Sequence, residues 1–183
     1  MKALFNRFYE TYHQDIYNYV FYMVKDKTIT EDIVQEVYIR VIKSYDRFRG
    51  DSSEKTWAFS IARHIVFDHF RKQKRKRKVT NETIDLDDMT EFIPARETTP
   101  DEAIIHQEDV ALMYQLLDQC SVNQKQVVIL RYIQHHSLKE TAEILDLTVS
   151  NVKTLQHRAI KKLKSLLDEE KAKGGIMDDE TRR

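Results

Sequence analysis

The chain has 183 residues, of which 41% are hydrophobic and 33% are charged, and its formal net charge is zero. Glycine and proline are scarce, with three and two residues, which argues against a fold rich in strands and turns. The single cysteine excludes an intramolecular disulfide, and no apolar run approaches the roughly 20 residues of a membrane span. Because the amino-terminal residues are too polar for a signal peptide, the sequence predicts a cytoplasmic, helical protein.

Charge is distributed unevenly along the chain. Residues 71–78 and 153–164 are rich in Lys and Arg, whereas residues 85–102 are rich in Asp and Glu. The two basic blocks, rather than the neutral total, indicate where phosphate groups could bind.

Apolar residues recur every three or four positions through residues 3–25, which predicts a first helix whose aromatic residues belong to the core. Thr28 and Glu31 form a capping-box pattern, which predicts that a second helix starts there. Its apolar residues, including Ile33 and Val37, should point inward. Four polar residues remain on its outward face: Asp32, Gln35, Glu36 and Arg40. Periodicity alone is equally consistent with a merely solvated face.

A loop interrupts the helical pattern at residues 48–53, where Gly50 suggests a backbone shape that other residues resist. The helix expected over residues 54–76 interleaves aromatic with basic residues and ends in the first basic block. This combination suits melted nucleic acid, because cations contact phosphates and flat rings stack on unpaired bases. A core helix with a basic end would have the same composition, so both interpretations stay open at this point.

Helical periodicity disappears over residues 79–99, where acidic residues accumulate, and this change predicts a linker between two domains. Pro100 suits the first turn of a helix over residues 100–119. The helix after it should be capped by Ser121 together with Gln124.

Residues 135–167 have the pattern of a helix-turn-helix. Ser137 and Glu140 match a capping box for the first helix, a short turn follows, and Thr148 or Ser150 can cap the second helix. The second helix carries polar and basic residues on its outer faces, among them Lys153, Thr154, His157 and Arg158. Such a unit places its second helix in the DNA major groove. An ordinary helical hairpin with a charged face would show the same periodicity.

No catalytic, cofactor or metal site is expected. His135 and His136 are adjacent and would point apart on a helix, and no pair of cysteines has the spacing of metal ligands. The glycine motifs of nucleotide-binding loops are missing as well. We therefore expect no small-molecule substrate, and an enzyme is the least favoured class.

Three segments together resemble one family, the extracytoplasmic-function (ECF) sigma factors of bacterial RNA polymerase, with the sigma-X-like subgroup as the nearest type. Residues 30–48 resemble the family's region 2.2, residues 48–72 resemble regions 2.3 and 2.4, and residues 124–164 resemble region 4. The resemblance covers nearly the whole chain, in the family's order. It implies an all-α fold of two small helical domains joined by a flexible acidic linker. The implied parts are region 2 over residues 1–78, the linker over 79–99, region 4 over 100–168 and a tail over 169–183.

The resemblance also implies roles for individual residues. Four would dock on the clamp helices of the polymerase: Asp32, Gln35, Glu36 and Arg40. The loop at 48–53 and the helix after it would capture a flipped base and contact the −10 promoter element, through Phe48, Arg49, Asp51, Ser52, Trp57, Phe59, Ile61, Arg63, His64, Phe67, Asp68, Arg71 and Lys72. Lys153, Thr154, His157 and Arg158 would read the −35 element. Asp146 replaces the usual Gly of the turn, and His64 stands where Asn is common, so the promoter sequence itself stays open.

A chain of this kind is expected to be an alternative sigma factor, which binds core RNA polymerase, recognises −35 and −10 elements and opens the −10 DNA. The implied partners are the clamp helices and flap of the polymerase, promoter DNA, and an anti-sigma factor of the membrane-anchored type. Two rival hypotheses remain. One is a dimeric helix-turn-helix repressor or activator acting without the polymerase, and the other is an RNA-binding or anti-termination protein that uses residues 54–78.

Overall fold

The computed structural model describes residues 2–78 and 107–180, and all regular elements within these ranges are helical. The first range forms α1 (Lys2–Val24), α2 (Lys27–Ser44), the 3-10 turn η1 (Tyr45–Arg47) and α3 (Glu54–Lys78). The second forms α4 (Gln107–Asp118), α5 (Val122–Val128), the π-helical segment η2 (Ile129–Ile133), α6 (Leu138–Leu145) and α7 (Val149–Glu180). The predicted linker and the start of the helix expected from residue 100 lie outside the described residues. Among those described, none of the helices is both long and apolar enough to cross a bilayer.

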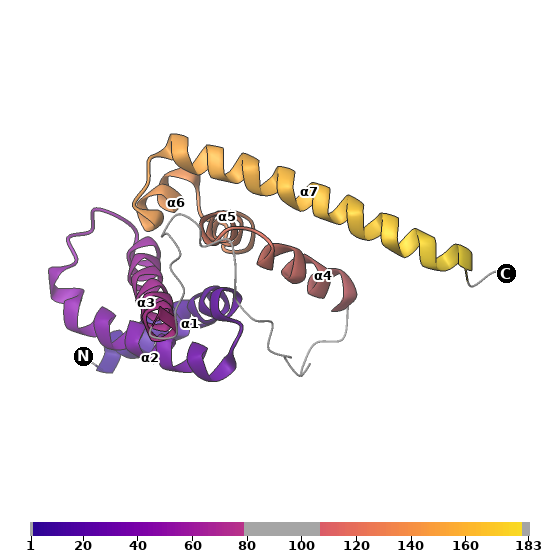
Figure 1. The fold of residues 1–183 in the computed structure, drawn as a ribbon. Coiled ribbons are helices and arrows are strands. Elements are labelled where there is room, and N and C mark those ends of the chain that lie inside the picture. The colour runs from indigo at the N-terminus through magenta and orange to yellow at the C-terminus, as the bar shows by residue number, and fades with distance from the viewer. Residues whose placement is uncertain (1, 79–106, 181–183) are drawn as a thin grey trace.

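Helices α1, α2 and α3 pack together and form the amino-terminal half (Figure 1). Their buried residues recur at helical spacing, as expected, and Phe8 and Tyr19 are fully buried. Phe8 lies in an aromatic cluster, with ring centroids 4.9 Å from Tyr12 and 6.4 Å from Trp57. The prediction that aromatic residues of the first helix serve the core is confirmed for Phe8 and Tyr19.

The prediction that Thr28 caps the second helix is wrong. Helix α2 starts earlier, at Lys27, and its cap is Asp26, whose carboxylate accepts a hydrogen bond from the backbone N–H of Ile29. An Asp in extended conformation is as good a cap as Thr, and Lys25 before it adopts a positive φ of 56° that turns the chain out of α1.

The carboxyl-terminal half confirms both other capping boxes. Ser121 caps α5 with Gln124, and Ser137 caps α6 with Glu140. Between α6 and α7 the chain turns at Asp146, whose φ of 53° is left-handed. Asp tolerates this conformation better than most residues other than Gly, so Asp146 can fill the position usually held by Gly.

Helix α7 is longer than the sequence indicated. The hydroxyl of Thr148 accepts a hydrogen bond from the N–H of Asn151 and so caps its start. The helix then continues to Glu180, through most of the segment expected to be a tail. Residues 168–173 are mostly Lys, Glu and Ala, which favour helix over coil.

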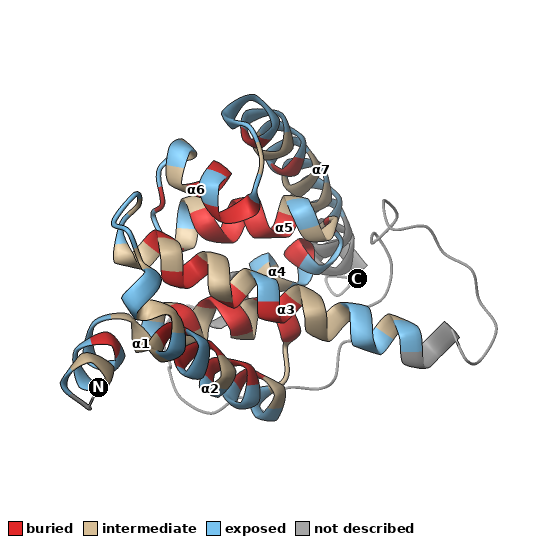
Figure 2. Ribbon diagram, turned by 90° about the vertical axis from the view of Figure 1, so that its left-hand side faces the viewer, coloured by how far each residue is buried: buried red, intermediate tan, exposed pale blue. Residues whose placement is uncertain are grey.

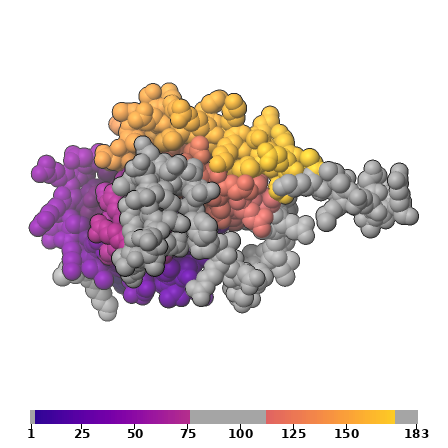
Figure 3. Space-filling view, viewed as in Figure 1, coloured from indigo at the N-terminus to yellow at the C-terminus, as the bar shows by residue number. Residues whose placement is uncertain are grey.

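The two halves pack against each other. Helix α6 lies between α3 and α7, and one cluster of buried apolar residues extends through both halves (Figures 1 and 2). At the junction the ring of Phe59 meets that of His136 edge-on, with centroids 4.7 Å apart. The Thr56 hydroxyl also donates to the Glu140 carboxylate across 3.4 Å. In the space-filling view the carboxyl-terminal half covers one side of the amino-terminal half (Figure 3).

A second set of contacts joins the end of α1 to α4. The rings of Tyr22 and Tyr114 stack 4.7 Å apart, and the Lys25 ammonium lies 4.4 Å from the Tyr114 ring. Lys25 also lies 3.9 Å from the carboxylate of Asp118. Burial lowers the pKa of Lys25 to about 8, with nearby Lys125 acting in the same direction and Asp118 opposing it.

Candidate nucleic-acid and polymerase interfaces

The outer face of α7 presents the residues expected to read duplex DNA. Lys153, Thr154, His157 and Arg158 are all exposed on this helix. Among the described residues, neither Lys153 nor Arg158 forms an ion pair, so both charges remain available to a ligand. The structure therefore brings all four predicted residues together on one accessible surface.

Helix α7, which carries these four residues, is fixed in place by its buried inner face. Val152 and Ala159 on its inner face have no exposed surface. Val152 packs in the main core with Leu145 at the end of α6. This arrangement fixes the angle between α6 and α7, which is the property a helix-turn-helix needs to present its second helix to a groove.

Helix α3 carries most of the residues predicted to contact a melted strand. His64, Arg71 and Lys72 are exposed, and Trp57, Ile61, Arg63, Phe67 and Asp68 are half-buried. Within this set the Arg63 guanidinium lies 5.0 Å from the Phe67 ring, and Arg71 pairs with Asp68 across 3.6 Å. Most of these residues follow one outward stripe of α3, with a cation and an aromatic ring side by side, as single-stranded nucleic acid requires.

Phe59 is located differently from the rest of the predicted set. Its side chain is fully buried, with its ring 5.4 Å from Tyr19 and 4.7 Å from His136. It faces the other half of the molecule rather than the outward stripe. Burial, aided by the positive charge of Lys55, lowers the pKa of His136 to about 4, so this ring is neutral at pH 7.

The loop before α3 is anchored at both ends. At its start the Phe48 ring lies 4.9 Å from the ring of Trp57, and at its end the Ser53 hydroxyl accepts a hydrogen bond from the N–H of Thr56. Gly50 has a φ of +75°, which L side chains rarely adopt, so the unusual shape suggested by this glycine is confirmed. Arg49, Asp51 and Ser52 form the rest of the loop, the first two exposed and the last half-buried.

Sequence reasoning did not find the residue that braces this loop. Arg7 on α1 forms an ion pair with Glu54 at 2.7 Å and donates a hydrogen bond to the Tyr45 hydroxyl at 2.9 Å. The Tyr45 hydroxyl donates in turn to Glu54. The hydrogen bond from Arg7 is the main reason why the pKa of Glu54 is lowered. Arg7 and Glu54 lie 47 positions apart, so no local pattern signals the pair.

The four residues predicted to face the polymerase lie on the outer side of α2. Asp32, Gln35 and Arg40 are exposed, and Glu36 is half-buried and pairs with Arg40. Ile39 lies among them and is 51% exposed. It was not among the predicted interface residues, although its spacing of three and four residues from Glu36 and Gln35 places it on the same outward face of the helix. A groove of about 470 Å³ between α1 and α2 includes Ile39 together with Gln35 and several aromatic residues.

Family models and known relatives of this chain point to the same protein family. Residues 8–76 match the family model of Sigma-70 region 2, and residues 116–165 match that of Sigma-70 region 4. The chain is 49% identical to the ECF RNA polymerase sigma factor SigX of Bacillus subtilis (strain 168), over 100% of this chain and 92% of that protein. It is 31% identical to the RNA polymerase sigma factor SigV of the same organism, over 92% of this chain and 94% of that protein.

Two solved structures share the fold at lower sequence identity. One is the sigma factor RpoE in complex with the anti-sigma factor NepR from Bartonella quintana, with a TM-score of 0.74, 21% identity and coverage of 90% of this chain and 96% of that chain. The other is CnrH in complex with the cytosolic domain of CnrY, with a TM-score of 0.66, 20% identity and coverage of 92% and 90%.

Proposed function

The chain belongs to the ECF sigma factors of RNA polymerase and acts as an alternative sigma factor in transcription initiation. From this premise we propose that it recognises promoters through two separate surfaces, the outer face of α7 for the −35 element and the outward stripe of α3 with the 48–53 loop for the −10 element. The observation that carries the proposal is that the two sets of predicted residues, except Phe59, gather on separate accessible faces, one on α7 and one on α3 with the loop before it.

The α7 surface suits duplex DNA. Exposed Lys153 and Arg158 can donate hydrogen bonds to the guanine edge or to phosphates, and each good base contact gives roughly 1–3 kcal/mol of discrimination. The buried inner face of α7 holds these donors in place without the help of another protein.

The α3 surface suits a strand that has already left the duplex. Flipping a base costs a few kcal/mol, and each lost stacking step costs about 1.4 kcal/mol on average. The braced loop between Phe48 and Ser53 could offset the cost of one flipped base. A longer bubble needs further contacts, so the chain should open promoters only together with core RNA polymerase.

We propose that the polymerase docks on the outer side of α2, where an exposed apolar residue, Ile39, is surrounded by charged and polar ones. This pattern is typical of a protein interface with a dry centre and a polar rim. One of the two similar solved structures is a sigma factor in complex with an anti-sigma factor, and we propose that this chain too is held inactive by an anti-sigma factor, of the membrane-anchored type. Sigma factors are regulatory rather than catalytic, and we propose that this chain does no covalent chemistry and works in the cytoplasm.

The test is run-off transcription with purified core RNA polymerase, with and without this protein, on promoter fragments from its host. We expect new, specific transcripts only in its presence, and their start sites would identify both promoter elements. Tight promoter binding by the protein alone, without any transcripts, would instead favour a repressor or activator that works without the polymerase.

A further inference from the structure

The loop at 48–53 depends on its two ends for its shape. Its tip is open, since a Cβ added to Gly50 would meet no atom within 4 Å beyond its chain neighbours. At one end the backbone N–H of Phe48 donates to the carbonyl oxygen of Tyr45 across 2.9 Å, so the loop starts directly from η1. At the other end Glu54 begins α3. The distance between Tyr45 and Glu54 therefore controls the opening of the loop.

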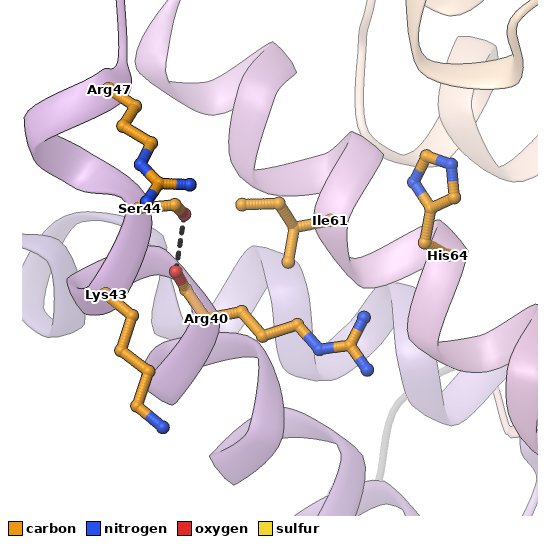
Figure 4. A pocket seen from close by; sticks show the side chains of 6 residues that line it. All are labelled: Arg40, Lys43, Ser44, Arg47, Ile61 and His64. Atoms are coloured by element: carbon orange, nitrogen blue, oxygen red, sulfur yellow. Dashed lines mark hydrogen bonds between the residues drawn. The ribbon is translucent and has the colours of Figure 1, made fainter.

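Next to the start of this loop, a cavity separates α2 and η1 from α3 (Figure 4). Its volume is about 440 Å³, and six residues line it: Arg40, Lys43, Ser44, Arg47, Ile61 and His64. The hydrogen bond drawn among these six joins the Ser44 hydroxyl to the backbone oxygen of Arg40, within α2. None of the six forms a hydrogen bond with another of them across the cavity, so these residues do not tie η1 to α3.

The tie comes from α1. Arg7 donates to both carboxylate oxygens of Glu54, at 2.7 and 3.0 Å, and to the Tyr45 hydroxyl at 2.9 Å. The Tyr45 hydroxyl donates in turn to Glu54, and this hydrogen bond raises the pKa of Tyr45, so that the hydroxyl keeps its proton. These three side chains, which we call the loop brace, form a closed set of hydrogen bonds between α1, the first residue of η1 and the first residue of α3.

The loop brace is poorly placed to stabilise the fold. The Arg7 side chain is 52% exposed, and ion pairs in water contribute little to the free energy of unfolding. A second ion pair joins the same two helices, from Asp15 of α1 to Lys55 of α3, also at 2.7 Å. This second pair does not include η1. The two pairs therefore have the same length and connect the same helices, and they differ in whether the start of the loop is held as well.

We propose that Arg7 and Tyr45 are positioning residues for strand opening, which hold the ends of the 48–53 loop at the separation needed to capture a flipped base; this inference rests on the proposed function. They act through Phe48 and Glu54 and need not touch the DNA. A loop that is already ordered loses less conformational entropy when it binds, so more of the binding energy can offset the cost of unstacking the base. Loss of the brace should therefore impair opening of the −10 DNA and leave binding to core polymerase unchanged.

The experiment follows strand opening by this chain in complex with core polymerase. The fluorescent base 2-aminopurine replaces one base at a time in the −10 non-template strand, because its emission rises when it leaves the stack. We expect Arg7→Ala and Tyr45→Phe to reduce this rise at the captured base several-fold, together with run-off transcription from the duplex promoter. Tyr45→Phe keeps the aromatic ring, so its effect reports the hydroxyl alone. Asp15→Ala is the matched control and should behave as the wild type does.

The double variant Arg7→Ala, Tyr45→Phe tests whether the two residues work as one unit. Since both act through the same set of hydrogen bonds, the double variant should be no more impaired than the worse single variant. Losses that multiply would overturn the shared role. Urea denaturation of Arg7→Ala and Asp15→Ala should give nearly equal free energies of unfolding. A loss of stability confined to Arg7→Ala, with normal opening by Tyr45→Phe, would make Arg7 a merely structural residue and refute the proposal.

The remaining outcomes separate the loop brace from the proposed function. If the wild type gives no specific transcripts, both the function and the positioning role fall. If the wild type opens the promoter and Arg7→Ala and Tyr45→Phe open it as well as Asp15→Ala does, the positioning role is wrong and the function stands. A weaker affinity of Arg7→Ala for core polymerase that accounts for its whole defect would assign Arg7 to the polymerase interface and would also overturn the proposal.

Discussion

Helices α3 and α7 both carry residues that are predicted to contact DNA, but their buried faces pack against different parts of the molecule. Helix α7 buries one apolar stripe against its own half and leaves its cationic face open. Helix α3 buries residues against α1 and α2 and, through Thr56 and Phe59, against the opposite half as well. The predicted contact of α7 with duplex DNA would therefore need no change of the structure. Any change in the packing of the two halves would instead affect α3 directly.

The largest effect is expected from Phe59→Ala. This side chain is fully buried at the junction, and removing a buried phenylalanine costs about 3–5 kcal/mol of unfolding free energy. Phe67→Ala on the outward stripe of the same helix is the matched control and should cost much less, because Phe67 is only half-buried. Urea denaturation measures both. Equal losses for the two variants would show that the inner side of α3 is not packed as described.

A pH effect should follow from His136. Because its pKa in the folded protein is about 4, below the usual 6.5, the folded state favours the neutral ring. The contribution of His136 to the free energy of unfolding is then fully present above about pH 6.5 and is lost as the pH drops. At pH 5 this group alone lowers the free energy of unfolding by about 2 kcal/mol. Lys55 contributes to this lowering, while Glu140 and Asp15 oppose it.

The measurement is the unfolding free energy of the wild type and of His136→Gln between pH 7 and pH 5. Their difference isolates His136 from other groups, including His13, whose pKa burial also lowers. The wild type should lose more stability than the variant as the pH falls. Parallel curves would contradict the burial of a neutral ring at the junction.

On the open surface, Lys153→Ala and Arg158→Ala should leave stability unchanged and weaken use of the −35 element. Loss of a base contact worth 1–3 kcal/mol corresponds to about a 5- to 150-fold fall in promoter use. Lys164→Ala, on the same face of α7 about three turns further along, is the control. Transcription from promoters with intact and altered −35 elements tests the assignment, and an equal loss of affinity for core polymerase would refute it.

The smallest of these effects is expected for Ile39→Ala on the outer side of α2. Removing a partly buried apolar contact of about 1 kcal/mol would weaken binding to core polymerase roughly fivefold. Lys27→Ala on the same helix should bind normally. Binding of fluorescently labelled protein to core polymerase gives both affinities. An unchanged affinity for Ile39→Ala would remove this residue from the docking surface.

Local features of the fold could be predicted from the sequence because they depend on neighbouring residues. The capping boxes at Ser121 and Ser137 are examples, as is the unusual backbone at Gly50. The cap of α2 was misplaced because Asp26 and Thr28 are both good caps and only the fold selects between them.

Contacts between distant residues could not be predicted in this way. Thr56 and Glu140 lie 84 positions apart, and no periodicity reveals that α6 covers that side of α3. For the same reason the family resemblance grouped Phe59 with the residues of α3 that are predicted to contact DNA, whereas the structure places it at the junction with His136.

The most direct test of two separate DNA surfaces compares transcription from a duplex promoter and from one whose −10 region is already open. If α3 and its loop bind the open strand, the loop variants Arg49→Ala and Asp51→Ala should give less transcript than the wild type from the duplex promoter. Their transcription should recover in part on the open template, because the cost of unstacking has been removed. Lys153→Ala should remain equally impaired on both templates, since its contact is to duplex DNA. If opening the −10 region rescued Lys153→Ala as well as the loop variants, the division of promoter recognition between α7 and α3 would be wrong.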